Sequence, residues 1–118
     1  MKLGLMSAAL PQLSFEELVA WLSKNGFGMI EVACWPQGKA ERRYAGVTHI
    51  DVAKLKKKDV KSIHATLEKH GMQISSLGYY PNPLHPDLDH RQQVIDHLQK
   101  VIVAAEMLSV PIVGTFVG

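Results

Sequence analysis

The chain has 118 residues, of which 47% are hydrophobic and 20% are charged, and its formal net charge is +2. This composition is typical of a globular domain, it excludes a disordered chain, and the length allows one domain with a modest core. The small charge gives no indication of nucleic acid or a membrane surface as a partner, and no apolar run reaches the roughly 20 residues of a spanning helix. A single cysteine, Cys34, excludes an internal disulfide, so we expect a reducing compartment, the cytoplasm.

After an opening apolar strand at residues 2–6, a unit of helix, glycine and strand recurs along the chain. In the first copy, Ser14 and Glu17 have the spacing of a capping box, and apolar residues follow them at helical spacing. Gly26 can supply the left-handed conformation that ends such a helix. We expect the next strand at residues 29–34.

The unit returns twice more. We expect Asp59 to cap a second helix that ends at Gly71 and leads into a strand at residues 72–77. Asp89 is expected to cap a third helix, followed by a strand at residues 112–117. One face of this third helix carries the apolar residues Val94, Ile95, Leu98, Val101, Ile102, Ala105 and Leu108. The stretch from 36 to 58 reads as irregular, and we expect a short strand or turn in it at 47–52.

Apolar strands that alternate with helices predict an α/β fold with a parallel sheet covered on both faces. A doubly wound sheet of this length would have five strands and finish on a covering helix, whereas this chain finishes on a strand. A (β/α)8 TIM barrel takes about 250 residues, so four strands make about half of one. We therefore predict a single partial domain over residues 1–118, (βα)3β, the N-terminal half of a barrel that is either truncated or completed by a partner.

Ligands of parallel α/β proteins bind where the strands end, and Glu31 lies near one such end between two apolar neighbours. A carboxylate in an apolar strand needs a partner. Two interpretations remain open: the carboxylate binds a substrate hydroxyl or a charged neighbour in the barrel mouth, or it forms a structural ion pair with a Lys or Arg.

Aromatic residues follow two of the strands. Tyr79 and Tyr80 precede Pro81 and Pro83, which stiffen the turn, and Trp35 precedes another proline. Such a turn can form a shelf for the apolar face of a sugar ring. It can equally be an aromatic plug that packs the loop onto the following helix.

Six histidines raise the question of a metal, but their spacing gives little support for one. We expect His64, His70 and His97 to face solvent or to cap helices. The pairs His49-Ile50-Asp51 and His85-Pro86-Asp87 lie in loops on the exit side, yet a metal site needs three or four ligands. Cys34 has no activating motif and is expected to be a buried structural thiol.

Positive charge is concentrated between residues 39 and 61. We favour a solvated surface for these side chains, with attraction of a phosphate group as the alternative. The residues concerned are Lys39, Arg42, Arg43, Lys54, Lys56, Lys57, Lys58 and Lys61.

Several segments together resemble a known family. They are Lys2-Leu3-Gly4-Leu5, the stretch 26–32, Ala45-Gly46-Val47-Thr48-His49-Ile50-Asp51-Val52, the stretch 76–87 and Thr115-Phe116-Val117-Gly118. The resemblance is to the sugar phosphate isomerase/epimerase group of xylose isomerase-like TIM barrels, relatives of the tagatose and psicose epimerases and of endonuclease IV. It covers essentially the whole chain, and residues 78–87 are its most specific part.

The resemblance implies metal-assisted proton transfer next to a sugar carbonyl, with a divalent Mn²⁺ or Mg²⁺ ion and two carboxylates as acid and base. In the epimerase relatives the metal ligands lie on strands five to eight, so it assigns neither metal ligands nor catalytic residues here. This chain alone is therefore expected to bind no metal and to be inactive.

What the resemblance carries over is a substrate wall for a small carbohydrate or sugar phosphate. The wall consists of Met6, Glu31, Trp35, Gly78, Tyr79, Tyr80, Thr115 and Phe116, with His85 further along the loop after the third strand. A three-metal nuclease site like that of endonuclease IV is disfavoured, because the ends of the third and fourth strands offer Tyr and Phe in place of His.

Two other functions remain open. The chain could be a binding or structural module without catalysis, in which two copies form a homodimer through the exposed edge of the fourth strand and close a barrel around a carbohydrate. Alternatively, the complete protein could be a sugar-acid dehydratase or a hydroxypyruvate-type isomerase of the same barrel group.

Overall fold

Four strands alternate with helices in the computed structural model, which describes residues 1–38 and 45–118. The elements are β1 (Gly4–Met6), the 3-10 turn η1 (Ser7–Ala9), α1 (Phe15–Lys24), β2 (Met29–Ala33), α2 (Lys57–Lys69), β3 (Gln73–Gly78), α3 (Leu88–Met107) and β4 (Val113–Gly114). The order is the predicted one, although β1 and β4 are shorter than expected. The residues expected in β4 after Gly114 continue as irregular chain.

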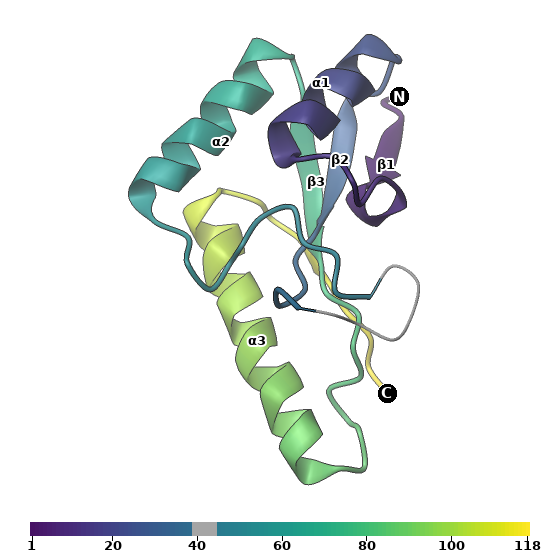
Figure 1. The fold of residues 1–118 in the computed structure, drawn as a ribbon, viewed down its shortest axis with the longest axis vertical. Coiled ribbons are helices and arrows are strands. Elements are labelled where there is room, and N and C mark those ends of the chain that lie inside the picture. The colour runs from purple at the N-terminus through teal and green to yellow at the C-terminus, as the bar shows by residue number, and fades with distance from the viewer. Residues whose placement is uncertain (39–44) are drawn as a thin grey trace.

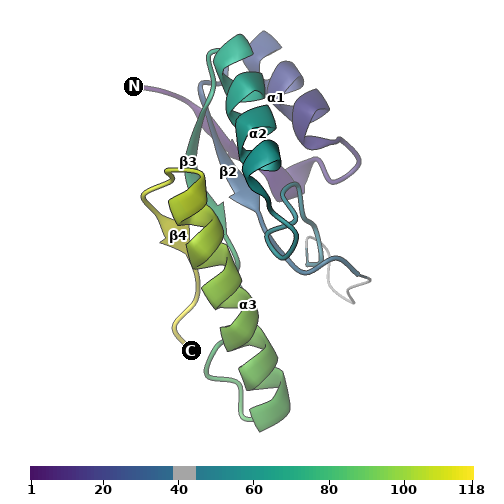
Figure 2. The ribbon, with the colours of Figure 1, turned by 90° about the vertical axis from the view of Figure 1, so that its left-hand side faces the viewer.

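The strands form one parallel sheet in the order β1-β2-β3-β4. The helices α1, α2 and α3 all lie on the same side of this sheet (Figures 1 and 2). A doubly wound sheet reverses its strand order at a switch point and carries helices on both faces. The sequential order and one-sided cover are those of a TIM-barrel segment. The expectation that both faces are covered was wrong, because no helix of the described part packs on the second face.

The sequence signals for the first helix act as predicted. The Ser14 hydroxyl accepts a hydrogen bond from the Glu17 backbone N–H at 3.1 Å, and the Glu17 carboxylate accepts one from the Ser14 N–H at 3.2 Å. Gly26 follows α1 with φ of +84°, and Gly71 follows α2 with φ of +62°. Both glycines therefore supply the left-handed residue that turns the chain from a helix toward the next strand.

The two predicted aspartate caps were placed too late in the chain. Helix α2 begins at Lys57, and Asp59 sits in its first turn, where its carboxylate accepts from the Lys56 N–H at 2.9 Å. Helix α3 is capped by Asp87, which accepts from the His90 N–H at 2.8 Å, and Asp89 lies within the first turn. An acidic residue in the first turn stabilises the helix dipole as a cap does, so composition alone does not separate the two positions.

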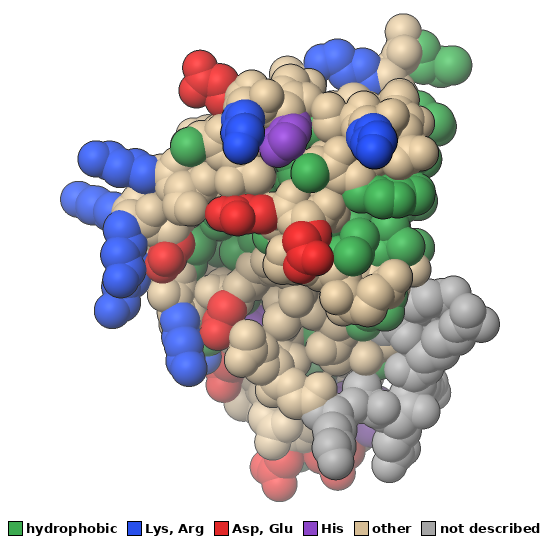
Figure 3. All heavy atoms as spheres, turned by 45° about the horizontal axis from the view of Figure 1, so that its top comes forward, with side chains coloured by type: hydrophobic (Ala, Val, Ile, Leu, Met, Phe, Trp, Pro, Cys, Tyr) green, Lys and Arg blue, Asp and Glu red, His purple; other side chains and the backbone are tan. Residues whose placement is uncertain are grey.

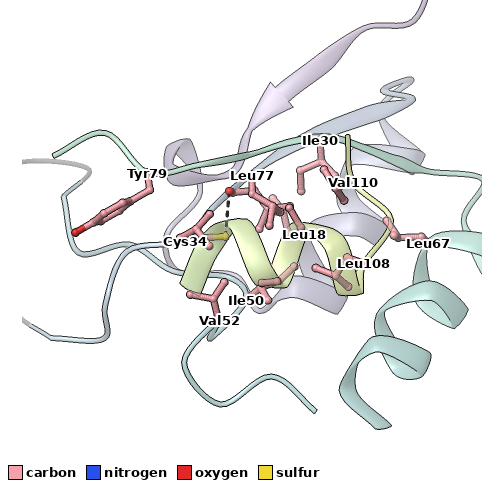
Figure 4. Packing of buried hydrophobic residues seen from close by; sticks show 14 of the residues in the cluster. Leu18, Ile30, Cys34, Ile50, Val52, Leu67, Leu77, Tyr79, Leu108 and Val110 are labelled. Atoms are coloured by element: carbon pink, nitrogen blue, oxygen red, sulfur yellow. Dashed lines mark hydrogen bonds between the residues drawn. The ribbon is translucent and has the colours of Figure 1, made fainter. Parts of the chain in front are cut away.

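The core lies between the sheet and the helices. On β2, Ile30 and Val32 have no exposed surface and Glu31 between them is only half-buried, which is the alternation of a strand with one helix-covered face. Leu18 of α1 and Leu77 of β3 are also fully buried, and Figure 4 shows them packed together with Ile30 and with residues that follow α3. This cluster fixes which side of each strand faces away from the helices.

Helix α3 buries a slightly different face from the predicted one. Val94, Val101 and Ala105 are buried, but Ile102 is 52% exposed, and His97 is buried in its place with 8% exposed. The buried set follows the 3.6-residue period through positions 94, 97 and 101, which leaves position 102 about a quarter turn away.

Residues 45–56 cross the end of the sheet before α2. Thr48 forms a single antiparallel bridge with Cys34, so the short strand or turn expected at 47–52 is one bridge long. Among the described helices, none has the length and apolar character needed to cross a membrane.

We predict different effects for the same leucine-to-alanine truncation at a buried and at an exposed position. Leu18→Ala should lower the free energy of unfolding by about 3 kcal/mol, because it leaves a cavity beneath the sheet. Leu88→Ala removes the same atoms from a side chain that is 65% exposed and should cost less than about 0.5 kcal/mol. Urea unfolding followed by circular dichroism measures both, and equal losses would contradict the proposed core.

Candidate functional site

The sheet face that no described helix covers carries the candidate site at its carboxyl end. Strand register pairs Met6 with Glu31, and it pairs Gly78 with Gly114. Because side chains alternate along a strand, Glu31 projects from the face opposite the one that buries Ile30. The site therefore begins as a row of residues on the open face, where ligands of barrel proteins bind.

Glu31 is paired with a phenol. The Tyr80 hydroxyl, from the loop after β3, donates a hydrogen bond to Glu31 Oε1. Within residues 1–38 and 45–118, the partner of this carboxylate is thus a phenol and not the Lys or Arg of a structural ion pair. Burial, together with the hydrogen bond and the negative charge of Glu31, raises the pKa of Tyr80 to about 12. Tyr80 consequently remains a protonated donor at neutral pH.

Two glycines make room for this pair. A Cβ atom at Gly78 would lie 2.7 Å from Glu31 Oε1 and 2.9 Å from Cε2 of Tyr80. A Cβ atom at Gly114 would lie 3.2 Å from Cζ of Tyr80 and 3.4 Å from Glu31 Oε1. Gly78 was among the predicted wall residues, but Gly114 was not. Gly114 belongs to the site because it pairs with Gly78 in the sheet, and this register cannot be predicted from sequence alone.

Aromatic rings flank the pair on both sides. The ring of Tyr80 lies 5.9 Å from that of Trp35 and 5.2 Å from that of Phe116, measured between centroids. Phe116 is 56% exposed, so this row of rings is accessible to solvent. Met6 completes the set, with its Cε 3.3 Å from the position of a Cβ at Gly78. The structure thus brings together six of the predicted wall residues: Met6, Glu31, Trp35, Gly78, Tyr80 and Phe116.

Tyr79 borders this group at Trp35 but is buried against the helix layer. It is only 3% exposed and packs against His97 of α3 at 4.6 Å between ring centroids, and against Trp35 at 5.7 Å. Burial raises its pKa to about 12. The two open interpretations of the aromatic turn therefore apply to different residues. Tyr80 has the position of a shelf, and Tyr79 is the plug that joins the loop to the helix layer.

His97 supports the end of β2 from the helix side. Its Nε2 is 2.7 Å from the Cys34 carbonyl oxygen, to which it donates. The expectation that His97 faces solvent or caps a helix was wrong, because this hydrogen bond satisfies the imidazole inside the core. His64, by contrast, donates to the Leu108 carbonyl at 2.9 Å and so caps the end of α3. Cys34 is buried, and burial raises the pKa of its thiol to about 12, as expected for a structural thiol.

Within the described residues, no hydrogen bond joins Thr115 or His85 to the pair. Thr115 falls between Gly114 and Phe116 in the chain, and its Oγ1 is buried without a hydrogen-bond partner in the described residues. His85 lies in the loop before α3, where its Nδ1 accepts from the Asp87 N–H at 3.1 Å and its ring is 4.4 Å from that of His90. A role in substrate binding for any of the wall residues remains a prediction.

The described residues do not fit a metal centre. Within residues 1–38 and 45–118, no group of three or more His, Cys, Asp and Glu side chains could hold a metal ion. His49 instead donates from Nε2 to the Leu10 carbonyl at 3.3 Å, and its Nδ1 is buried without a partner in that part of the chain. Desolvation lowers the pKa of His49, which favours the neutral ring.

A separate hollow of about 710 Å³ lies on the helix side, between the start of α1 and α2. Its lining mixes Lys54, Lys56 and Lys58 with Glu16, Asp51 and Asp59. Figure 3 shows several basic side chains gathered along one side of this view of the molecule. All five described lysines of the basic cluster are exposed, in agreement with a solvated surface. The other members, Lys39, Arg42 and Arg43, lie outside the described residues.

Comparisons with known proteins agree with the fold. The family model of the xylose isomerase-like TIM barrel matches residues 19–118. Fourteen chains of solved structures match as well. One is a xylose isomerase domain containing protein from Salmonella typhimurium, with a TM-score of 0.57 and 17% identity over 91% of this chain. The match covers 33% of the Salmonella protein, so the chain spans about a third of its length. No curated protein matches the chain.

The glycines at the site lead to a second prediction. Gly78→Ala should lower the free energy of unfolding by about 1–3 kcal/mol, because the new methyl group displaces Glu31 and the Tyr80 ring. In Gly28→Ala the methyl group meets only the flexible side chain of Lys2, at 3.4 Å, and the change should stay within about 0.5 kcal/mol. Urea unfolding measures both, and a neutral Gly78→Ala would show that the pair is not closely packed.

His49 leads to a prediction about pH. Its pKa in the folded chain lies below the ordinary value of 6.5, so the unfolded chain takes up a proton first as pH falls. The stability that the neutral ring contributes is thus complete above about pH 6.5 and is lost as pH falls below it. Urea unfolding at pH 7.5 and 5.5 should show a larger loss for wild type than for His49→Gln. Equal losses in the two proteins would contradict this role.

Proposed function

The chain belongs to the xylose isomerase-like TIM barrel family, and we propose that it forms the substrate wall of a carbohydrate isomerase or epimerase. The reaction of the complete protein is proton transfer next to a sugar carbonyl. The observation that carries this proposal is the Glu31–Tyr80 pair between the rings of Trp35 and Phe116, on the open face at the strand ends.

Each part of the wall has a chemical use in holding a sugar. Aromatic faces pack against the apolar C–H face of a pyranose or furanose ring, and they exclude water from it. The Glu31 carboxylate, held in place by Tyr80, accepts hydrogen bonds from sugar hydroxyls. Because Trp35 and Tyr80 follow strands of the same rigid sheet, the wall fixes the orientation of the sugar before any proton moves.

The chemical step requires residues beyond this wall. A divalent ion such as Mn²⁺ or Mg²⁺ would polarise the sugar carbonyl in the complete protein. Since the described residues do not fit a metal centre, we assign no step to one, and we propose that its ligands come from other segments of the complete barrel. The 118-residue chain alone is accordingly proposed to bind sugar without turning it over.

The ligand that this proposal names is a small carbohydrate or sugar phosphate, with neither nucleic acid nor membrane as a partner. The net charge of +2 gives no electrostatic reason for either partner. Cys34, the only cysteine, is a free and buried thiol, which fits a reducing compartment. We therefore propose a cytoplasmic location.

A titration with D-fructose tests the wall. The indole N–H signal of Trp35 in the NMR spectrum should shift saturably with fructose concentration, and that of Trp21, 42% exposed on α1, should not. Phe116→Ala should weaken binding about three- to tenfold, because it removes one stacking face worth about 1 kcal/mol.

Trp21→Ala is the matched control, because it removes another exposed aromatic ring and should leave fructose affinity unchanged. Addition of Mn²⁺ to the 118-residue chain should give no epimerised product. A titration without any shift at Trp35 would refute the wall. Turnover of sugar by the 118-residue monomer would refute the proposal that the metal ligands lie in other segments of the complete barrel.

A second candidate is the self-associating half-barrel, in which two copies close one barrel around a carbohydrate without catalysis. The observation that favours it is apolar surface at both edges of the sheet. Leu3 before β1 is 61% exposed, and beside β4 the values are 57% for Ile112 and 87% for Val117. Unpaired edge strands with apolar side chains tend to associate. The partner in this case is a second copy of the chain.

Light scattering coupled to size-exclusion chromatography distinguishes the two candidates. The half-barrel module predicts a stable homodimer at micromolar concentration, and Ile112→Lys should convert it to a monomer because a charge would be buried at the edge of β4. Leu88→Lys, on an exposed leucine of α3, is the control and should leave the mass unchanged. A wild-type monomer at high concentration would exclude the module.

A further inference from the structure

The hydrogen-bonding capacity of the Glu31–Tyr80 pair is one-sided. A tyrosine hydroxyl has a single hydrogen to donate, and in this structure Tyr80 donates it to Glu31 Oε1. A carboxylate has no hydrogen to donate. What the pair still offers to a ligand is Oε2 of Glu31 and the lone pairs of the Tyr80 oxygen. All of these are acceptors, so the ligand group beside them must be a donor.

The described residues around the pair, in 1–38 and 45–118, add no positive charge. Its neighbours in the described part of the chain are Trp35, Gly78, Gly114 and Phe116, with Met6 next to Gly78, and all of them are uncharged. The described lysines of the basic cluster lie elsewhere, at and before α2 on the helix side of the sheet (Figures 1 and 3). As far as the described residues form it, the open face at the strand ends is therefore negative at Glu31 and apolar around it.

From these two observations we propose that the Glu31–Tyr80 pair is a specificity determinant that selects the hydroxyl-bearing, unphosphorylated part of the sugar and excludes phosphate from this wall. Neighbouring sugar hydroxyls donate to the two acceptors, and the ring lies against Trp35 and Phe116. A phosphate group at the same position brings negative charge against the Glu31 carboxylate, which costs binding energy. This inference rests on the proposed function and narrows its substrate class.

The proposal can be tested with two ligands that contain the same sugar, one with free hydroxyls and one with phosphate groups. D-Fructose and D-fructose 1,6-bisphosphate present the same carbon skeleton, but the bisphosphate carries a phosphate at either end, so turning the sugar around cannot avoid the clash. The amide signals of Gly78 and Gly114 report binding at the pair itself, because both glycines lie directly beside it. Phosphate held by the lysines of α2 would leave these two signals in place.

The experiment titrates the ¹⁵N-labelled 118-residue chain with each sugar and follows Gly78, Gly114 and the Trp35 indole. We expect D-fructose to bind at least about tenfold more tightly than the bisphosphate, a difference of about 1.4 kcal/mol. Inorganic phosphate at the same concentration should shift none of the three signals. The ratio of the two sugar affinities, measured in wild type alone, shows whether this wall selects against phosphate.

Variants assign the selection to Glu31. Glu31→Gln keeps the shape of the side chain, removes its charge and adds a donor, so the ratio should fall to about twofold or less. Tyr80→Phe keeps the charge but removes the hydroxyl that holds the Glu31 carboxylate in place, so fructose should bind more weakly while the ratio persists. Glu16→Gln neutralises an exposed carboxylate of α1 and should leave both affinities unchanged.

The possible failures are distinct. If neither sugar shifts the three signals, the substrate wall itself is refuted. If both sugars shift them with equal affinity, or the bisphosphate binds more tightly, the wall stands and the selection against phosphate is wrong. If wild type discriminates and Glu31→Gln discriminates equally, Glu31 is not the determinant.

Discussion

The hydrogen bond between Tyr80 and Glu31 is the constraint on which the open face of the sheet depends. Strand β2 is otherwise apolar, and a half-buried carboxylate in it needs a partner. The phenol meets that need from the adjacent strand end, and in doing so it brings the Tyr80 ring over Gly78 and Gly114. The aromatic row and the acceptor at its centre are therefore consequences of one interaction rather than separate features.

Much of the fold could be predicted because its signals are local. A capping box at Ser14, glycines after two helices and apolar strands specify each unit through its own sequence. The predictions erred where several residues could serve equally, as with Asp59 and Asp89 in first turns instead of caps. His97 was missed because its burial depends on the Cys34 carbonyl, which is distant in sequence.

The candidate site was only partly predictable, and the reason is register. Glu31 stands out in the sequence, but its partner does not, because β2 and β3 shift register between Ile30 and Glu31. A shift of one residue exchanges the two faces of a strand. Alternation alone could not show that Tyr80 faces the pair while Tyr79 packs against α3, nor that Gly114 lies beside Tyr80. These placements depend on contacts between residues that are distant in sequence.

The glycines beside the pair also limit how relatives of this chain can diverge. Positions 78 and 114 have no room for a side chain as long as position 80 holds a ring whose hydroxyl reaches Glu31. A lineage that exchanges Tyr80 for a small residue releases both positions at once, and larger side chains can then fill the vacated space. The three positions are thus expected to change together across homologues, so an aligned family would show them as a coupled group independent of the capping and core positions.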